Sequence, residues 1–246
     1  MRYAIIAGLL AGLIFPGIAS SGGAANPAST VGRENFGFTF ELENQAKKLD
    51  KDHTTSKRLV GKAIWGVTDK LDLYARLGAS DLKVAVTDAR DFEGQRGMTW
   101  GGGARYRVAE MPHSLNAYID AQMLAFTSTG SVWRDFEGYS DRYADRYKWN
   151  EIQFSCFAAW QRDVFSPYAG FGITNIFGRL TQDVFRTGVG LYDHAAHNFR
   201  QDAVPEAILG VDFNLGGSGR LSGELRYSDD GDISFVLGAS ELWLVK

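Results

Sequence analysis

The sequence predicts an all-β protein, an up-and-down antiparallel β-barrel of about ten strands, with eight as the smaller alternative. Three observations predict it. Apolar and polar residues alternate in one segment after another, the connections alternate between short and long, and the composition favours strands. The 246 residues include 29 Gly against 5 Pro, and 13% of them are aromatic. This composition is typical of crowded strands that are separated by many turns.

The alternation is clearest in LDLYARLGASDL, residues 71–82. Every second residue from Leu71 to Ala79 is apolar, whereas Asp72 and Arg76 lie between them. A strand with this period has two unlike faces. The same pattern predicts strands over residues 35–42, 59–67, 71–82, 98–108, 115–126, 149–162, 167–177, 204–215, 220–227 and 233–245.

The N-terminal residues have the layout of a secretory signal peptide. Arg2 precedes an apolar run from Ala4 to Phe15, and a Pro16-Gly17 break and small residues follow. The run is too short for a transmembrane helix. We therefore expect residues 1–25 to be a cleaved signal peptide and residues 26–246 to form a single exported barrel domain.

The bulk composition excludes several classes of function. The net charge of −3 gives no basic field for nucleic acid, so no nucleic-acid partner is expected. Cys156 is the single cysteine, which excludes an intrachain disulfide framework and a cysteine-based zinc site. Beyond the N-terminal run no stretch approaches 18 apolar residues, so any membrane crossing must use strands.

The connections and the aromatic residues indicate which face of the strands lies on the outside of the barrel. Short turns and long polar connections alternate strictly along the predicted strands up to the last link, residues 228–232, which is short. This order is typical of outer-membrane barrels. Trp65, Trp100, Tyr106 and Trp160 lie near segment ends, where an interfacial girdle would place them. The apolar face is therefore expected to meet lipid in a transmembrane β-barrel. The alternative is a soluble lipocalin-like barrel whose apolar face encloses a ligand.

Three segments carry a resemblance to a known group of proteins: VTDKLDLYARLGASDL at 67–82, SPYAGFGI at 166–173 and SFVLGAS at 234–240. The chain, over roughly residues 32–246, resembles the small outer-membrane β-barrel proteins of the porin-like superfamily in Gram-negative bacteria. The resemblance implies a location in the outer membrane. It also implies contact with outer-membrane lipid and lipopolysaccharide, and with the barrel-insertion machinery.

If the apolar face meets lipid, charged residues on the other face line the lumen. A barrel this narrow is filled by side chains, and buried charges need partners or water. Two interpretations stay open: a salt-bridged interior that closes the barrel, and a narrow porin-like conducting path. We expect Asp72 to pair with neighbouring cations such as Lys62 and Arg105, and Arg76 to pair with Glu41 or Asp120. The predicted lumen residues are Glu41, Lys62, Asp72, Arg76, Arg105, Arg107, Asp120, Glu151, Glu206, Asp212, Glu224 and Arg226.

The predicted loop at residues 131–149 repeats aromatic residues, Arg and Asp. Aromatic and Arg side chains often dominate binding interfaces, so this loop is a candidate site for a surface protein partner. The alternative is an ordered loop that packs on itself. The binding candidates are Trp133, Arg134, Tyr139, Tyr143 and Tyr147.

The loop after residue 177 contains Asp193, His194 and His197, which could hold a metal ion if the segment were locally helical. Solvated loop histidines are the alternative, and no metal or cofactor is expected. An outer-membrane hydrolase that uses a loop His and a carboxylate is a further alternative. Because no His here has a known catalytic spacing, we expect the protein not to be an enzyme.

Overall fold

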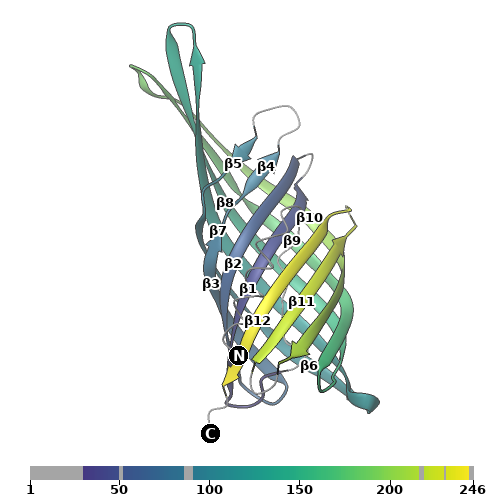
Figure 1. Ribbon diagram of the computed structural model, residues 1–246. Helices are drawn as coiled ribbons and strands as arrows, with labels where there is room; N and C mark the ends of the chain where they lie inside the picture. Colours follow the sequence, from purple (N-terminus) through teal and green to yellow (C-terminus); the bar gives the residue numbers. More distant parts are fainter. Residues whose placement is uncertain (1–29, 50–51, 86–90, 216–218, 230, 244–246) are drawn as a thin grey trace.

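The computed structural model describes residues 30–49, 52–85, 91–215, 219–229 and 231–243 (Figure 1). The predicted signal peptide lies outside the described residues. Nearly all described residues belong to strands of one antiparallel sheet. The strands are β1 (Phe36–Leu49), β2 (Asp52–Gly66), β3 (Leu71–Ser80), β4 (Lys83–Ala85), β5 (Phe92–Glu93), β6 (Gly97–Met111), β7 (Leu115–Phe136), β8 (Tyr139–Trp160), β9 (Phe165–Arg186), β10 (Gly190–Asn214), β11 (Gly219–Ser228) and β12 (Ile233–Trp243).

Ten of these strands form a closed ring, which confirms the predicted up-and-down barrel. Each ring strand pairs with its neighbours in the chain, and β1 closes the ring by pairing with β12 from Phe36↔Trp243 to Asn44↔Phe235. The short strands β4 and β5 stand outside the ring order and add to the edge of β2. They lie in the connection between β3 and β6.

The two ends of the barrel differ, as the alternating connections predicted (Figure 1). We call the lower end in Figure 1, where residues 67–70, 112–114 and 161–164 connect strands, the short-turn end. The helical element among the described residues is the 3-10 turn Pro112–Ser114 at this end. In this part of the chain no helix is long and apolar enough to span a membrane.

At the opposite end two predicted loops are strands instead. The prediction of loops over residues 127–148 and 178–203 was wrong, because β7 pairs with β8 up to Phe136↔Tyr139 and β9 pairs with β10 up to Arg186↔Gly190. Gly138, with a φ of 87°, supplies the left-handed backbone of the first turn. We call residues 127–148 and 178–203 the upper sheet, which projects beyond the ring (Figure 1).

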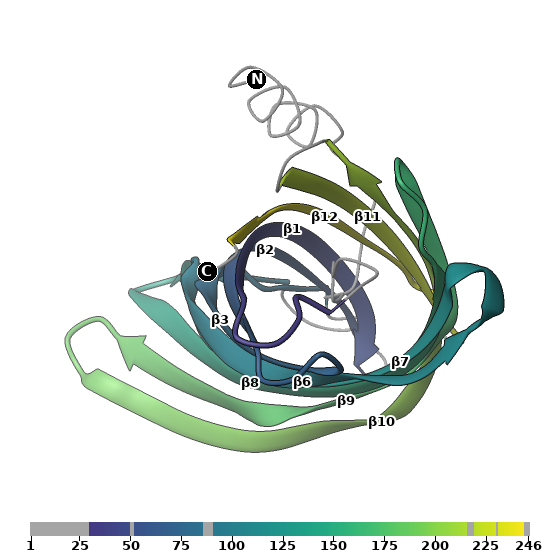
Figure 2. The same ribbon diagram turned by 90° about the horizontal axis from the view of Figure 1, so that it is seen from below.

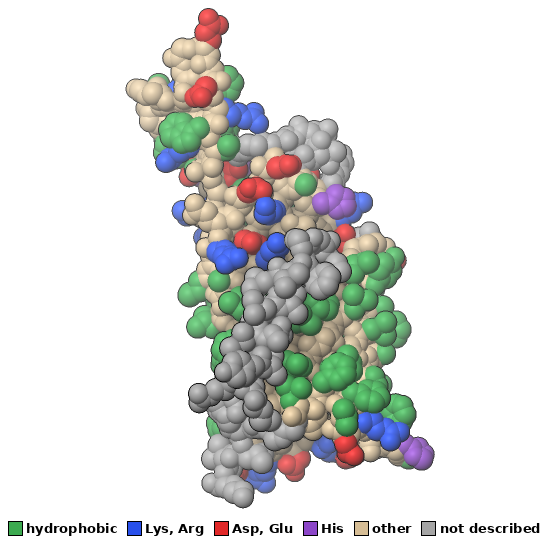
Figure 3. Space-filling view, viewed as in Figure 1, with side chains coloured by type: hydrophobic (Ala, Val, Ile, Leu, Met, Phe, Trp, Pro, Cys, Tyr) green, Lys and Arg blue, Asp and Glu red, His purple; other side chains and the backbone are tan. Residues whose placement is uncertain are grey.

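The two faces of the ring confirm the prediction that the apolar side chains point outward and the charged side chains point into the lumen. Outward Leu77 and Phe171 are 61% and 71% exposed, whereas inward Glu41 and Lys62 are 0% exposed. Apolar side chains gather over the lower part of the molecule in Figure 3, and charged ones lie above and at the lower rim. The soluble ligand-binding alternative is wrong, because it required the apolar face to point inward.

Candidate functional site

The middle of the lumen holds a network of ion pairs between neighbouring and facing strands. On β3, Arg76 Nη2 lies 2.7 Å from Glu41 on β1 and also contacts Glu43. Lys62 Nζ on β2 lies 3.5 Å from the second oxygen of Glu41. The expected partner of Arg76, Glu41, is therefore in place, and Glu43 is an additional partner.

A second group of ion pairs spans the lumen from β2 to β8. Arg58 Nη2 lies 3.0 Å from Glu151 Oε2, and Arg58 Nη1 lies 3.6 Å from Glu43. The Gln45 side chain also donates to Glu151, at 3.0 Å. Arg58, Glu43 and Gln45 were missed from the sequence because the predicted strands ended at residue 42 and resumed at residue 59, whereas β1 and β2 continue across this interval.

The third group of ion pairs joins β1, near the start of the chain, to β10 and β11, near its end. On β11, Arg226 Nε lies 2.6 Å from Glu224, and Nη1 lies 3.3 Å from Glu206 on β10. Glu206 also contacts Lys47 on β1. The Tyr168 hydroxyl donates to Glu224 at 2.9 Å. Asp212 is buried on β10, toward the short-turn end.

Near the short-turn end the pairs differ from those expected for Asp72. Its carboxylate accepts a hydrogen bond from the Val31 N–H at 3.1 Å, because residues 30–35 cross this mouth of the barrel (Figure 2). Arg105 lies opposite Asp72 in the strand register but forms its ion pair with Asp120, at 3.2 Å. Arg107 is half-buried at the rim, where its guanidinium donates to the Asp69 carbonyl.

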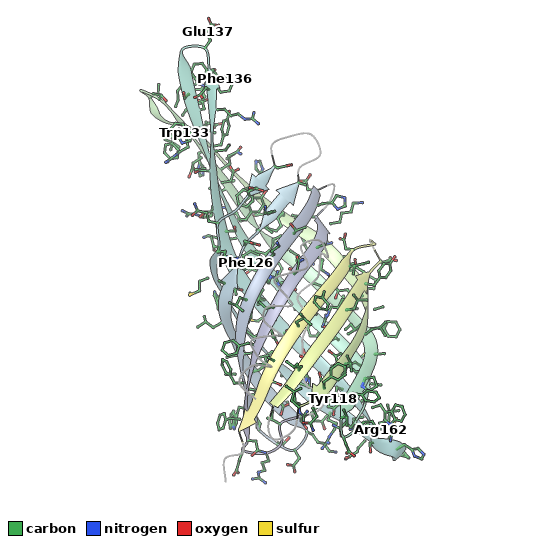
Figure 4. The ribbon with its side chains drawn as sticks, viewed as in Figure 1. Tyr118, Phe126, Trp133, Phe136, Glu137 and Arg162 are labelled. Carbon is green, nitrogen blue, oxygen red and sulfur yellow. The ribbon has the colours of Figure 1, made fainter. Side chains whose placement is uncertain are left out.

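Apolar clusters lie toward both ends of this network, and Figure 4 labels Phe126 of one and Tyr118 of the other. The outer layer consists of Leu49, Leu82, Val84, Phe92, Leu124, Phe126, Tyr147, Trp149 and Ile176. The lower layer consists of Tyr118, Phe157, Ala159, Tyr168 and Ile208 together with the cluster Val31, Ile64 and Tyr74. Glycine gives the lower layer its space, since a Cβ at Gly210 would lie 2.2 Å from the Tyr168 ring. The lumen is thus a stack of apolar, ionic and apolar layers.

This arrangement leaves the paired charges almost without solvent contact. The side chains of the Arg76, Arg58 and Arg226 pairs are at most 5% exposed. A continuous water path between the strands would expose these side chains. Each ion is instead stabilised by partners, because an isolated buried charge carries a large desolvation cost. The geometry is therefore that of a packed core rather than a pore.

The five binding candidates of the upper sheet separate into two groups. Trp133 is 60% exposed, with Arg142 6.0 Å from its ring, and Tyr139 stacks under Arg186 at 4.1 Å. Arg134 lies 5.6 Å over Tyr143. Tyr147, in contrast, is buried in the outer apolar layer and is not a surface residue.

The histidines of the predicted metal site lie in a strand, not in a helix. On β10, His194 Nδ1 lies 2.6 Å from Asp183 of β9, and both side chains are exposed. Asp193 accepts a hydrogen bond from the His194 backbone N–H. His197 is three residues further along the strand and therefore faces the opposite side. Among the described residues no group of three or more potential ligands could hold a metal ion.

Comparisons with known proteins agree with this architecture. No protein-family model and no curated protein matches the sequence. The translocator domain of the autotransporter NalP from Neisseria meningitidis is similar in structure, with a TM-score of 0.50, 7% identity, and coverage of 86% of this chain and 87% of that one.

Two further solved structures are similar over most of their length. An outer membrane channel from Pseudomonas putida F1 has a TM-score of 0.42 and 10% identity, covering 89% of this chain and 99% of that one. The outer membrane protease OmpT from Escherichia coli has a TM-score of 0.42 and 8% identity, covering 85% and 94%. The chain has the fold of an outer-membrane β-barrel protein. At these identities the likeness extends to the fold alone.

Proposed function

We propose that this protein is an outer-membrane β-barrel with a closed lumen, which holds the upper sheet at the cell surface so that it can bind a partner there. One observation carries the proposal: the charged lumen is packed and ion-paired, with apolar layers above and below it. A diffusion channel needs a continuous wet path, whereas the described side chains of the ionic layer have almost no solvent contact. The barrel therefore serves as an anchor.

The proposed orientation follows from the asymmetry of the ends. In outer-membrane barrels the short turns face the periplasm and the long connections face outward. The upper sheet then lies outside the cell, with exposed Trp133 and half-buried Arg142 on one of its faces. Aromatic and Arg side chains are the common anchors of protein interfaces, which favours a surface protein as partner.

Planar-bilayer recording tests the closed lumen. We expect the wild-type protein to give no single-channel steps at any voltage, because no water path crosses the ionic layer. Heat-denatured protein added in the same detergent serves as the control for leakage. Regular steps from the native protein, absent from the control, would overturn the closed-lumen proposal.

Cysteine labelling on intact Gram-negative cells tests the orientation. Glu137 and Arg162 lie at opposite ends of the molecule (Figure 4). In a Cys156→Ala background, we expect a membrane-impermeant maleimide to label Glu137→Cys on intact cells. Arg162→Cys should react only after the outer membrane is permeabilised. The reverse pattern would contradict the proposed orientation.

A further inference from the structure

On the outward face of β8, β9 and β10 the side chains change from apolar to cationic at one height along the barrel axis. Below it, the outward residues of β8 and β9 include the exposed apolar side chains of Ile152, Phe154 and Ile173. At the start of the upper sheet, the same face carries four exposed cationic side chains. These are Arg146, Lys148, Arg179 and Arg200, which we call the basic band.

The strand register brings the basic band together. Lys148 stands directly opposite Arg179, and Arg146 is two residues from Lys148 on the same face. Arg200 is opposite Phe177, two residues from Arg179. Directly opposed like charges on a sheet are destabilising unless something compensates them.

The tilt of the strands places the band at nearly one height. The front strands β12 and β11 in Figure 1 lean to the right as they rise. Around the ring the order continues β11, β10, β9, β8, so seen from outside these strands follow one another from left to right with the same lean. With strands about 4.8 Å apart, a rise of about 3.3 Å per residue and a tilt of about 40°, the four Cα atoms fall within about 5 Å of one level. A band of cations at constant height borders the apolar belt.

No described acidic side chain forms an ion pair with the band. Asp183 of β9 lies on this face, opposite Ala144, and it is held by His194 at 2.6 Å. Two of the cations have a hydroxyl residue as cross-strand neighbour, Thr127 beside Lys148 and Thr181 beside Arg146. These side chains are further hydrogen-bond donors. Among the side chains that the structure describes, this surface therefore offers positive charge and donors without a paired counter-charge.

We propose that the basic band binds the phosphates of a diphosphorylated glycolipid of the outer leaflet. The inference rests on the proposed orientation, which puts the band at headgroup depth directly above the acyl chains. Arg forks bind phosphate oxygens in a bidentate manner, and Lys adds a point charge. By the same strand geometry the band is about 16 Å wide, which accommodates two phosphates side by side. Phosphate binding also compensates the opposed charges of Lys148 and Arg179.

The test measures binding of diphosphoryl lipid A to the purified full-length barrel in neutral detergent, by native mass spectrometry. We expect Lys148→Gln/Arg179→Gln to weaken retention by about 30-fold, because each cation near an anionic lipid contributes roughly fivefold. The matched variant Lys70→Gln/Arg162→Gln removes the same charge at the short-turn end and should bind as the wild type does. Equal weakening of both variants, or of neither, would overturn the proposal.

Two arms identify the ligand. Monophosphoryl lipid A should bind more weakly than the diphosphoryl form, and inorganic phosphate should not displace the lipid. Equal binding of the two lipids, or displacement by inorganic phosphate, would overturn the assignment to a diphosphorylated lipid. The heat-modifiable gel shift of each variant reports that it is folded. If Glu137→Cys is labelled on intact cells while lipid binding is unchanged in Lys148→Gln/Arg179→Gln, the lipid inference alone fails.

Discussion

The ring and the upper sheet are built from the same strands, yet they use their two faces differently. Within the ring, one face of β8 and β9 packs against the layered lumen and the other meets lipid, so burial or lipid constrains every residue. Beyond the ring, Trp133 and Arg179 are exposed. The same backbone ladder therefore provides stability in one region and a surface free to vary in the other.

The largest expected difference between the regions concerns Arg76. Replacing it with Ala leaves Glu41 and Glu43 buried without their closest cation, and we expect the free energy of unfolding to fall by about 3–5 kcal/mol. Urea unfolding in lipid vesicles, followed by Trp fluorescence, measures the change. Arg142→Ala is the matched control in the upper sheet, with an expected loss of about 1 kcal/mol or less. Similar losses in both variants would mean that the lumen network contributes no more to stability than the upper sheet does.

The lipid face gives the next largest effect. Ile173→Lys places a charge in the apolar belt and should cost about 2–4 kcal/mol, because the ammonium must leave water. Ser131→Lys lies on the outward face of the upper sheet and should change stability by less than about 0.5 kcal/mol. The same unfolding measurement compares them. A tolerated lysine at Ile173 would mean that this face is not in lipid.

A truncation sharpens the boundary between the regions. Replacing residues 131–144 with an Asn-Gly turn between Gly130 and Asp145 keeps the strand register and leaves the outer apolar layer, including Tyr147 and Trp149, intact. The variant should fold with an unfolding free energy within about 1 kcal/mol of the wild type. Loss of the heat-modifiable gel shift would instead make the upper sheet part of the folding core.

The smallest expected effect is a pH response at the tip of the upper sheet. Arg186 donates to Asp141 at 2.9 and 3.0 Å, and this hydrogen bonding lowers the pKa of the Asp141 carboxyl. The stabilisation is therefore complete above the ordinary pKa of about 3.9 and is lost as pH falls through the lowered one. Amide exchange near Arg186, corrected for intrinsic rates, should accelerate once pH falls below the ordinary Asp pKa of about 3.9.

The control for this pH response is Asp141→Asn, which has no carboxyl to titrate. We expect exchange near Arg186 in this variant to show no comparable step as pH falls below about 3.9. The same step in both proteins would assign the response to another group.

The ring could be predicted from the sequence because lipid and lumen impose opposite demands on alternate residues. The segment at 71–82 shows this, as does the pairing of Arg76 with Glu41. The upper sheet could not be predicted in this way, since water on both faces removes the constraint that produces alternation. Its strands were therefore assigned to loops, and Tyr147 was placed on the surface although it packs in the outer layer.

The missing members of the lumen network have the same origin. Glu43, Lys47 and Arg58 lie where β1 and β2 continue above the predicted strands, and their polar surroundings were interpreted as a loop. The hydrogen bond of Asp72 to Val31 was hidden for another reason. A chain segment that crosses a barrel mouth has no periodic pattern, so only the three-dimensional structure reveals it.

The closure of β1 on β12 has a consequence for how quickly the barrel forms. Lys47 on the first strand contacts Glu206, 159 residues away, and β1 also supplies Glu41, Glu43 and Gln45 to the network. The pairing of β1 with β12 in addition requires the last strand to be in place before the first can complete the ring. Chains dominated by such distant contacts fold slowly, because the entropy of closing the long loop is lost before the contacts form. The rate of assembly is therefore expected to depend on the C-terminal strands. The completed barrel is expected to unfold slowly as well.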